Sequence, residues 1–224
     1  MNGETSDIRR HLQQVSELRA AREADSSLAS RVSAIKRYQH ARFERDYAGL
    51  LQSARHGAAA RFFLDDLYGP VDFAERDAQF GRAVPGLRRL LPADVMHMVA
   101  ALAQLHALSE DLDQEMAQAL STEQVSDASY RAAWRKVDRS ADRKRQIALV
   151  LEIGIALDRH ARSPLLAATL KLMRGPAKAA GMSELQSFLE RGMGAFAAMR
   201  GAQEFLETVT DRERHLIAEL FESP

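Results

Sequence analysis

The segment from Arg61 to Asp77, RFFLDDLYGPVDFAERD, holds the densest group of side chains that could do chemistry. Asp66 and Tyr68 stand out in it, because caps and turns explain most of its other polar residues and explain neither of these. A carboxylate and a phenol can transfer protons or hold a polar ligand. The phenylalanines of the segment can wall a pocket or fill a corner of the core, and the second use is the commoner.

Three further polar side chains share one face of a predicted helix. His106, Glu110 and Asp113 are spaced by four and three residues, which places them on one side of the helix. Such a trio can bind a metal or transfer protons if another helix supplies a further ligand. The chain has no Glu-x-x-His pair, although carboxylate-bridged di-iron bundles normally use two. The trio is therefore a candidate metal site, and no motif implies a cofactor.

Glu152 is the most conspicuous single carboxylate. Its neighbours along a predicted helix, Ala148, Leu149, Ile155 and Ala156, are all apolar, which predicts a desolvated headgroup. Burial raises the pKa of a carboxylic acid and can make it an acid or base near neutral pH. A buried pair with an arginine, or a side chain that points out between helices, would explain the same pattern.

Aromatic side chains and a glycine are the candidates for an apolar binding surface. Gly192 lies inside a predicted helix over residues 184–199, where glycine costs about 1 kcal/mol relative to alanine. The missing side chain leaves room for a crossing helix, which is the commoner reason, or for a flat ligand. The predicted ligand-binding residues are Phe62, Phe63, Tyr68, Phe73, Gly192 and Phe196.

The elements that must position these residues are helices. Helical start and stop signals recur along the chain, and no segment shows the alternation of a strand. The longest predicted helix covers residues 93–120. Ser163 with Pro164 suits a helix start, and so does Thr210 with Glu213 at capping-box spacing. We expect an all-α protein, a single-domain bundle of roughly eight to ten helices without a sheet.

We expect an N-terminal helical arm over residues 1–55 and a bundle core over residues 56–224, in one continuous domain. No low-complexity linker separates the two parts. Apolar residues of the arm at Ile8, Leu12 and Val15 follow the spacing of an amphipathic helix. Because such an arm has little else to pack on, its apolar face predicts a homodimer.

Composition excludes several kinds of site and partner. The 224 residues include no cysteine, so disulfides, thiol nucleophiles and thiolate metal sites are ruled out. The 31 basic and 31 acidic residues balance, and nucleic acid or an anionic membrane is therefore an unlikely partner. The basic run after Trp134 is more often a solvated helix face than a nucleic-acid site.

Location follows from what the sequence lacks. The longest apolar run covers residues 147–157 and is too short to span a bilayer. The N-terminal residues do not show the basic and then apolar pattern of a signal peptide. We therefore expect a cytoplasmic protein with no membrane partner.

The run RFFLDDLYGPVDFAERDAQF, continued by PGLRRLLP, LHALSEDLD and MRGPAKAAGMSELQSFLERG, resembles a bacterial family of uncharacterised helical proteins with an FFLxDLYGPxDF signature. The resemblance covers residues 61–213. It implies a bacterial, mainly helical protein, and it brings no catalytic assignment.

Two functions stay open on the sequence. The first is a non-catalytic protein that binds itself, another protein or a small ligand through its helices. The second is a helical enzyme or metalloprotein whose acid/base site is built from Glu152, Asp66, Tyr68 and His106. An enzyme should bring at least two of these side chains together in a polar pocket. A binding protein should instead show an apolar groove or a filled interface.

Overall fold

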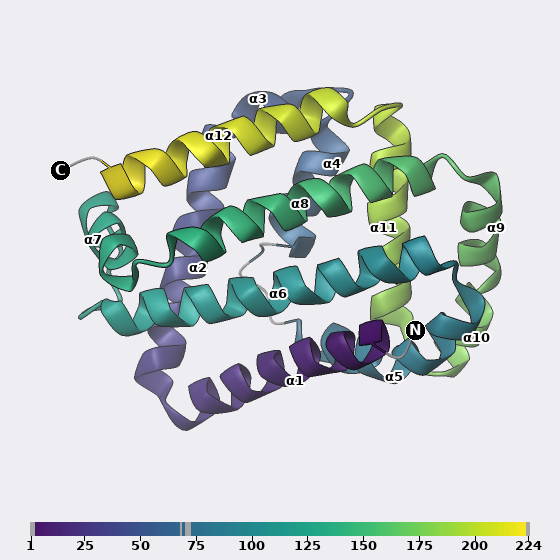
Figure 1. Cartoon of the computed structure of the whole chain (residues 1–224), viewed down its shortest axis with the longest axis horizontal. Helices are drawn as coiled ribbons and strands as arrows, with labels where there is room; N and C mark the ends of the chain where they lie inside the picture. Colours follow the sequence, from purple (N-terminus) through teal and green to yellow (C-terminus); the bar gives the residue numbers. More distant parts are fainter. Residues whose placement is uncertain (1–2, 68, 70–72, 223–224) are drawn as a thin grey trace.

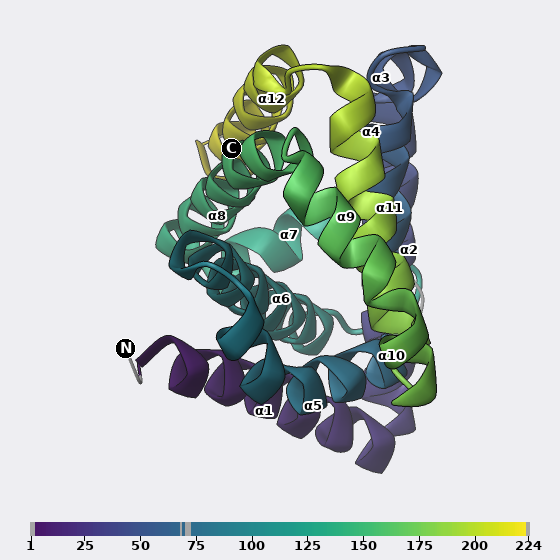
Figure 2. The same ribbon diagram turned by 90° about the vertical axis from the view of Figure 1, so that its right-hand side faces the viewer.

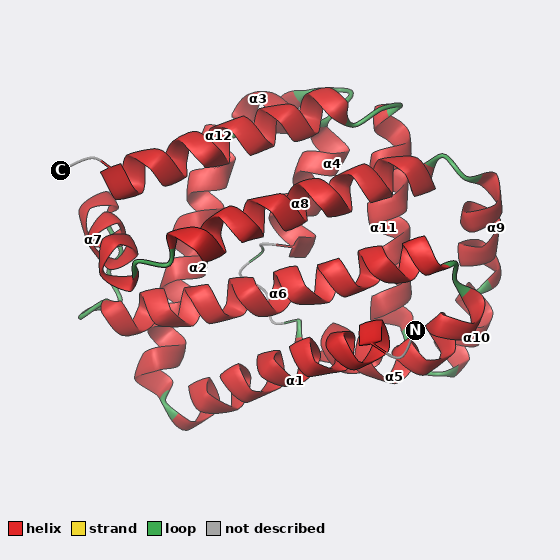
Figure 3. Cartoon of the chain, in the orientation of Figure 1, coloured by secondary structure: helices red, strands yellow, loops and turns green. Residues whose placement is uncertain are grey.

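The computed structural model describes residues 3–67, 69 and 73–222. These residues form helices and connecting turns, with no strand among them (Figure 3). The predicted all-α single domain is confirmed, and nine of the helices in the described ranges have nine or more residues. The elements in chain order are α1 (Gly3–Ala24), α2 (Ser26–Asp46), α3 (Ala48–Gln52), α4 (Gly57–Arg61), the π-helix η1 (Phe62–Leu67), α5 (Ala74–Leu90), α6 (Ala93–Ala119), α7 (Asp127–Val137), α8 (Ser140–Ala161), α9 (Pro164–Leu172), α10 (Arg174–Ala179), α11 (Ser183–Met199) and α12 (Gln203–Glu222).

The long helices form two layers that cross each other (Figures 1 and 2). In one layer α12, α8, α6 and α1 lie side by side in this order, each in contact with the next. The second layer consists of α2 and α11, with α4 beside α11. Helices α5, α9 and α10 lie together at the end of the molecule nearest the N-terminus (Figure 1). This arrangement makes α6 and α8 the centre of the fold.

The predicted N-terminal arm packs on its own chain. Helix α1 lies along α6, and α2 contacts α6 as well. Ile8 is fully buried in a cluster with Val84, Met96 and Val99, which come from α5 and α6. These contacts cover the apolar face from which the homodimer was predicted, and the homodimer itself stays a prediction.

Local signals explain where several helices begin. The Ser163 hydroxyl accepts a hydrogen bond of 3.3 Å from the backbone nitrogen of Leu166, and Pro164 opens α9 as predicted. The predicted start at Thr210 is wrong, because this residue lies inside α12. That helix begins at Gln203, after Arg200 and its neighbour Gly201 have ended α11 with φ angles of 54° and 129°.

No helix in the described part of the chain combines the length and apolar character that a membrane span requires. The longest, α6, matches the predicted 93–120 helix to within one residue. Helix α6 packs against α1, α2 and α8. These contacts lie on several of its sides, which explains why its buried apolar residues do too.

Candidate functional site

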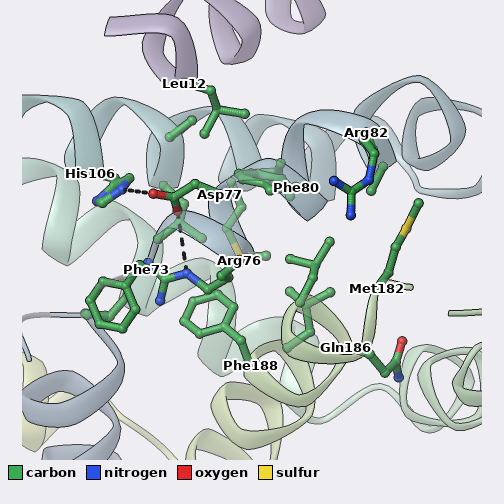
Figure 4. Close-up of a pocket in the computed structure, with 18 of the residues that line it drawn as sticks. Leu12, Phe73, Arg76, Asp77, Phe80, Arg82, His106, Met182, Gln186 and Phe188 are labelled. Carbon is green, nitrogen blue, oxygen red and sulfur yellow. Dashed lines mark hydrogen bonds and ion pairs between the residues drawn. The ribbon is translucent and has the colours of Figure 1, made fainter. Parts of the chain in front are cut away.

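A cavity of about 390 Å³ lies where α5, α9, α10 and α11 meet α6 (Figure 4). Most of its wall is apolar, and most of the lining residues come from α5, α6, α9, α10 and α11. Representative side chains are Phe80, Met98, Leu102, Leu170, Phe188 and Met193. Small-ligand sites in proteins commonly have volumes of about 300–1,000 Å³ and the same apolar character.

The segment singled out in the sequence reaches this cavity through a π-helical turn. Residues 62–67 form the π-helix η1, and π-helical turns are rare and frequent at functional sites. Gly69 follows, and a Cβ atom on it would lie 2.3 Å from the carbonyl oxygen of Asp65. Only glycine fits this close return of the chain. Beyond it, Phe73 and Arg76 line the cavity.

Arg76 is held between two aromatic rings at the cavity wall (Figure 4). Its guanidinium carbon lies 3.8 Å from the ring centroid of Phe73 and 4.7 Å from that of Phe188. Nη1 donates a hydrogen bond of 2.6 Å to the carbonyl oxygen of Asp66. Burial lowers the pKa of Arg76, and the carboxylate of Asp77 opposes that shift. An arginine nonetheless stays charged in proteins.

Asp77 joins this arginine to a histidine. Its Oδ2 lies 2.9 Å from Nε2 of His106 and accepts a hydrogen bond of 3.0 Å from Arg19. Its Oδ1 lies 3.7 Å from Nε of Arg76. Burial alone would raise the pKa of Asp77, but hydrogen bonding and the charges of these partners outweigh it and hold the pKa below its usual value. Asp77 is therefore a buried carboxylate anion in the cavity wall.

A second charged group continues along α6. Glu110 accepts a hydrogen bond of 2.6 Å from Arg22 and is paired with Lys36. Burial would raise the pKa of Glu110, yet these cations lower it to about 2. Asp113 accepts a hydrogen bond of 2.9 Å from Gln39, and burial raises its pKa. The cavity thus has an apolar part and one polar end.

The three predicted metal ligands face different partners. His106 contacts Asp77, whereas Glu110 and Asp113 contact side chains of α2. Within residues 3–67, 69 and 73–222, no group of three or more histidine or carboxylate side chains is arranged to hold a metal. A shared face on α6 was not enough, because His106 pairs with α5 whereas Glu110 and Asp113 pair with side chains of α1 and α2.

Of the predicted aromatic ligand-binding residues that the structure describes, Phe73 lines the cavity. Phe62, Phe63 and Phe196 are buried in the main core. The ring centroid of Phe63 lies 5.5 Å from that of Phe205, within a group of tilted and edge-to-face aromatic rings. Tyr68, predicted for both the ligand-binding and the acid/base site, lies outside the described residues.

The glycine in α11 has a packing explanation. A Cβ atom on Gly192 would lie 2.7 Å from Cζ of Phe62. The space that was predicted for a crossing helix or a flat ligand is filled by a ring from η1. Gly192 therefore fixes how η1 lies against α11.

The other acid/base candidates are apart from the cavity network. The Asp66 carboxylate accepts a hydrogen bond of 3.0 Å from Nε of Arg191. The Glu152 side chain is 37% exposed and lies 3.2 Å from Nε2 of His97 and 3.8 Å from Nη1 of Arg145. It was predicted to be desolvated, but the face of α8 that carries it is open to solvent. No hydrogen bond or ion pair among the described residues joins any two of Asp66, His106 and Glu152.

The residue that sequence reasoning missed is Arg76. A signal existed, because Phe73 precedes it by three residues and their backbones share one helical turn, shown by the 2.9 Å bond from Asp77 N to Phe73 O. Asp77 was also inside the highlighted segment. Its pairing with His106 on α6 could not be read from local spacing.

Trp134 is not available for stacking on a nucleic-acid base. It is 6% exposed, and the guanidinium of Arg143 lies 4.0 Å from its ring centroid. Phe221 packs beside it with a centroid separation of 5.8 Å. The basic run after Trp134 thus includes a residue that stabilises a second core cluster.

Fold and cavity together define an all-helical protein with a mostly apolar cavity between its helices. The chain belongs to the family of a domain of unknown function (DUF8198), whose model matches residues 18–224. The comparisons with curated proteins and with solved structures found no match. The family brings no activity, so the function rests on the geometry of the cavity.

Proposed function

We propose that this protein binds a small, mostly apolar molecule in the cavity between α5, α6, α9, α10 and α11. The observation that carries the proposal is the size and lining of the cavity, about 390 Å³ with mainly apolar walls. Small-molecule sites in proteins are typically concave, mostly apolar and of this size, with a few polar groups that orient the ligand. The cavity has these features, and they support a ligand.

The polar end of the cavity supports the same proposal. Asp77 and Glu110 are buried and are paired with the partly buried Arg19 and Arg22. Well-packed apolar residues in place of buried ion pairs are often as stable or more stable. Ligand sites, in contrast, need a few fixed polar groups to orient what they bind.

Binding of an uncharged apolar probe, 1-octanol, tests the proposal by isothermal titration calorimetry. Leu170 on α9 lines the cavity, and Leu170→Trp should fill it and abolish binding. Leu165 on the same helix is 78% exposed, so Leu165→Trp is the matched control and should bind like the wild type. Equal binding by the two variants, or no binding by the wild type, would contradict the proposal.

The pair of Asp77 and His106 supports a second candidate, an acid/base enzyme acting on the bound molecule. Nε2 of His106 is held by Asp77, and Nδ1 forms no hydrogen bond with the described residues. A carboxylate that orients an imidazole is a common acid/base arrangement. The test is whether a molecule that co-purifies with the protein changes mass on incubation with excess wild type but not with His106→Gln.

We further propose that the protein is bacterial, cytoplasmic and self-associating. The resemblance of the FFLDDLYGP run supports a bacterial origin, and a cytoplasmic location is proposed with it. Self-association is supported by the exposed apolar side chains of Ile155 and Leu172 on α8 and α9. Sedimentation velocity over a range of concentrations tests it, and a constant monomer mass would contradict it.

A further inference from the structure

We infer that the molecule bound in this cavity carries one carboxylate group, which Arg76 holds while the apolar remainder lies against α6, α9 and α11. The inference rests on the proposed binding function and adds the chemical class of the ligand. It depends on where Arg76 lies, on how its charge is shared, and on what surrounds it.

The guanidinium of Arg76 lies against two aromatic rings, and its N–H donors lie along its edge. The rings of Phe73 and Phe188 lie 3.8 Å and 4.7 Å from the guanidinium carbon (Figure 4). A guanidinium has five N–H donors in its plane. Among the described residues, the Asp66 carbonyl and the Asp77 carboxylate engage part of this edge. The flat fork of an arginine matches the two oxygens of a carboxylate.

The negative charge near Arg76 is shared among several cations. Asp77 faces Arg76 and also Arg19 at 3.0 Å and His106 at 2.9 Å. One carboxylate therefore serves two guanidinium groups and an imidazole. Arg76 shares this carboxylate with Arg19 and His106, so a ligand carboxylate would give Arg76 a counter-ion of its own.

The other charged side chains near Arg76 also carry more positive than negative charge. Burial raises the pKa of Asp113, which favours its neutral form. The other charged side chains around the polar end and Arg76 are the basic Arg19, Arg22, Lys36, Arg76 and Arg191 and the acidic Asp66, Asp77 and Glu110. With Asp113 included, five cations face four carboxylates among these described residues, and a ligand with one negative charge balances them.

A second cavity arginine provides an internal comparison. Arg82 lies on the same helix as Arg76, and its side chain is 52% exposed. It is 3.8 Å from Glu75 and donates to the carbonyl oxygen of Gly181 at 3.5 Å. Solvent screens a charge in this position, so Arg82 contributes little to holding an anion.

Three probes of equal chain length separate the head group from the tail: octanoate, 1-octanol and octylamine. Calorimetry on the full chain should give octanoate a dissociation constant lower than that of 1-octanol by about tenfold or more, as one charge-assisted hydrogen-bonded pair would give. Octylamine should bind more weakly than 1-octanol. In Arg76→Met, octanoate should fall to the level of 1-octanol, and the affinity for 1-octanol should stay unchanged. Arg82→Met should retain the preference for octanoate.

The outcomes distinguish this inference from the binding function on which it rests. If neither 1-octanol nor octanoate binds the wild type, the binding function itself fails. If 1-octanol binds and octanoate binds no more tightly, the cavity is a ligand site without a carboxylate preference and the inference is overturned. The wild-type ratio decides the matter even if Arg76→Met does not fold. Circular dichroism of Arg76→Met and of Arg76→Lys shows whether each is folded, and a folded Arg76→Met that keeps the preference would also overturn the inference.

Discussion

At the scale of single residues, two glycines of α11 give a matched test of the packing around η1. Gly192→Ala should place a Cβ atom against Phe62 and lower the free energy of unfolding by about 1–3 kcal/mol. Gly194 has open space around its Cβ position, so Gly194→Ala should be neutral or stabilising by up to about 1 kcal/mol. Urea denaturation measures both. Equal effects of the two substitutions would show that Phe62 does not need the space.

Glu110 predicts how stability depends on pH. Its pKa is lowered from 4.5 to about 2 in the folded state, so its stabilising contribution is complete above about pH 4.5 and is lost as the pH falls through about 2. Between pH 7 and pH 3 the wild type should lose about 2 kcal/mol from this residue. Glu110→Gln should be less stable at pH 7 and should lack this part of the pH dependence.

The control for that prediction lies on the same helix. The Glu115 side chain is 39% exposed and is 3.0 Å from Arg139. Exposed pairs of this kind contribute little, so Glu115→Gln should change the free energy of unfolding only slightly at either pH. Denaturant curves at pH 7 and pH 3 provide the comparison. A Glu110→Gln variant with the full wild-type pH dependence would contradict the assignment.

The residue types in the sequence predicted part of the site. Phe73 and His106 were predicted site residues, and both line the cavity. Arg76 and Asp77 are site residues because of contacts with other helices. Arg76 packs on Phe188, and Asp77 pairs with Arg19 and His106. Such contacts depend on how helices cross, and local spacing carries no information about that.

At the scale of elements, α9 is the least anchored wall of the cavity. None of its residues is buried, although Leu166 and Leu170 line the cavity. Segments with few buried contacts open most easily, so α9 amides should exchange hydrogen for deuterium faster than those of α6. Saturation with 1-octanol should slow exchange in α9 and leave α2 unchanged. Slow exchange in α9 without ligand would contradict this view of the wall.

Element boundaries show where the sequence was and was not sufficient. The long helix α6 and the start of α9 at Ser163 follow from periodicity and capping, which are local properties. The predicted helix start at Thr210 was wrong, because residues at the spacing of a capping box also occur inside a helix. The π-helical form of η1 was not predicted, since the packing of Phe62 on Gly192 comes from a distant part of the chain.

At the scale of the whole molecule, the helical class and single domain follow from composition and pattern. The way in which the two layers cross does not follow from the sequence. An amphipathic face predicts that a helix is covered, but it does not predict which helix covers it. The apolar face of α1 is an example. Ile8 was expected to lie in a dimer interface, and it packs on α5 and α6 of its own chain. The cavity is a property of that crossing, so it appears only in the assembled structure.

Native mass spectrometry of the freshly purified chain tests the central claim most directly. The wild type and Leu165→Trp should carry extra mass that is lost on denaturation, because the cavity retains its ligand through purification. Leu170→Trp should show the mass of the chain alone, since its cavity is filled. Extra mass retained equally by Leu170→Trp, or the bare chain mass in all three proteins, would contradict the account.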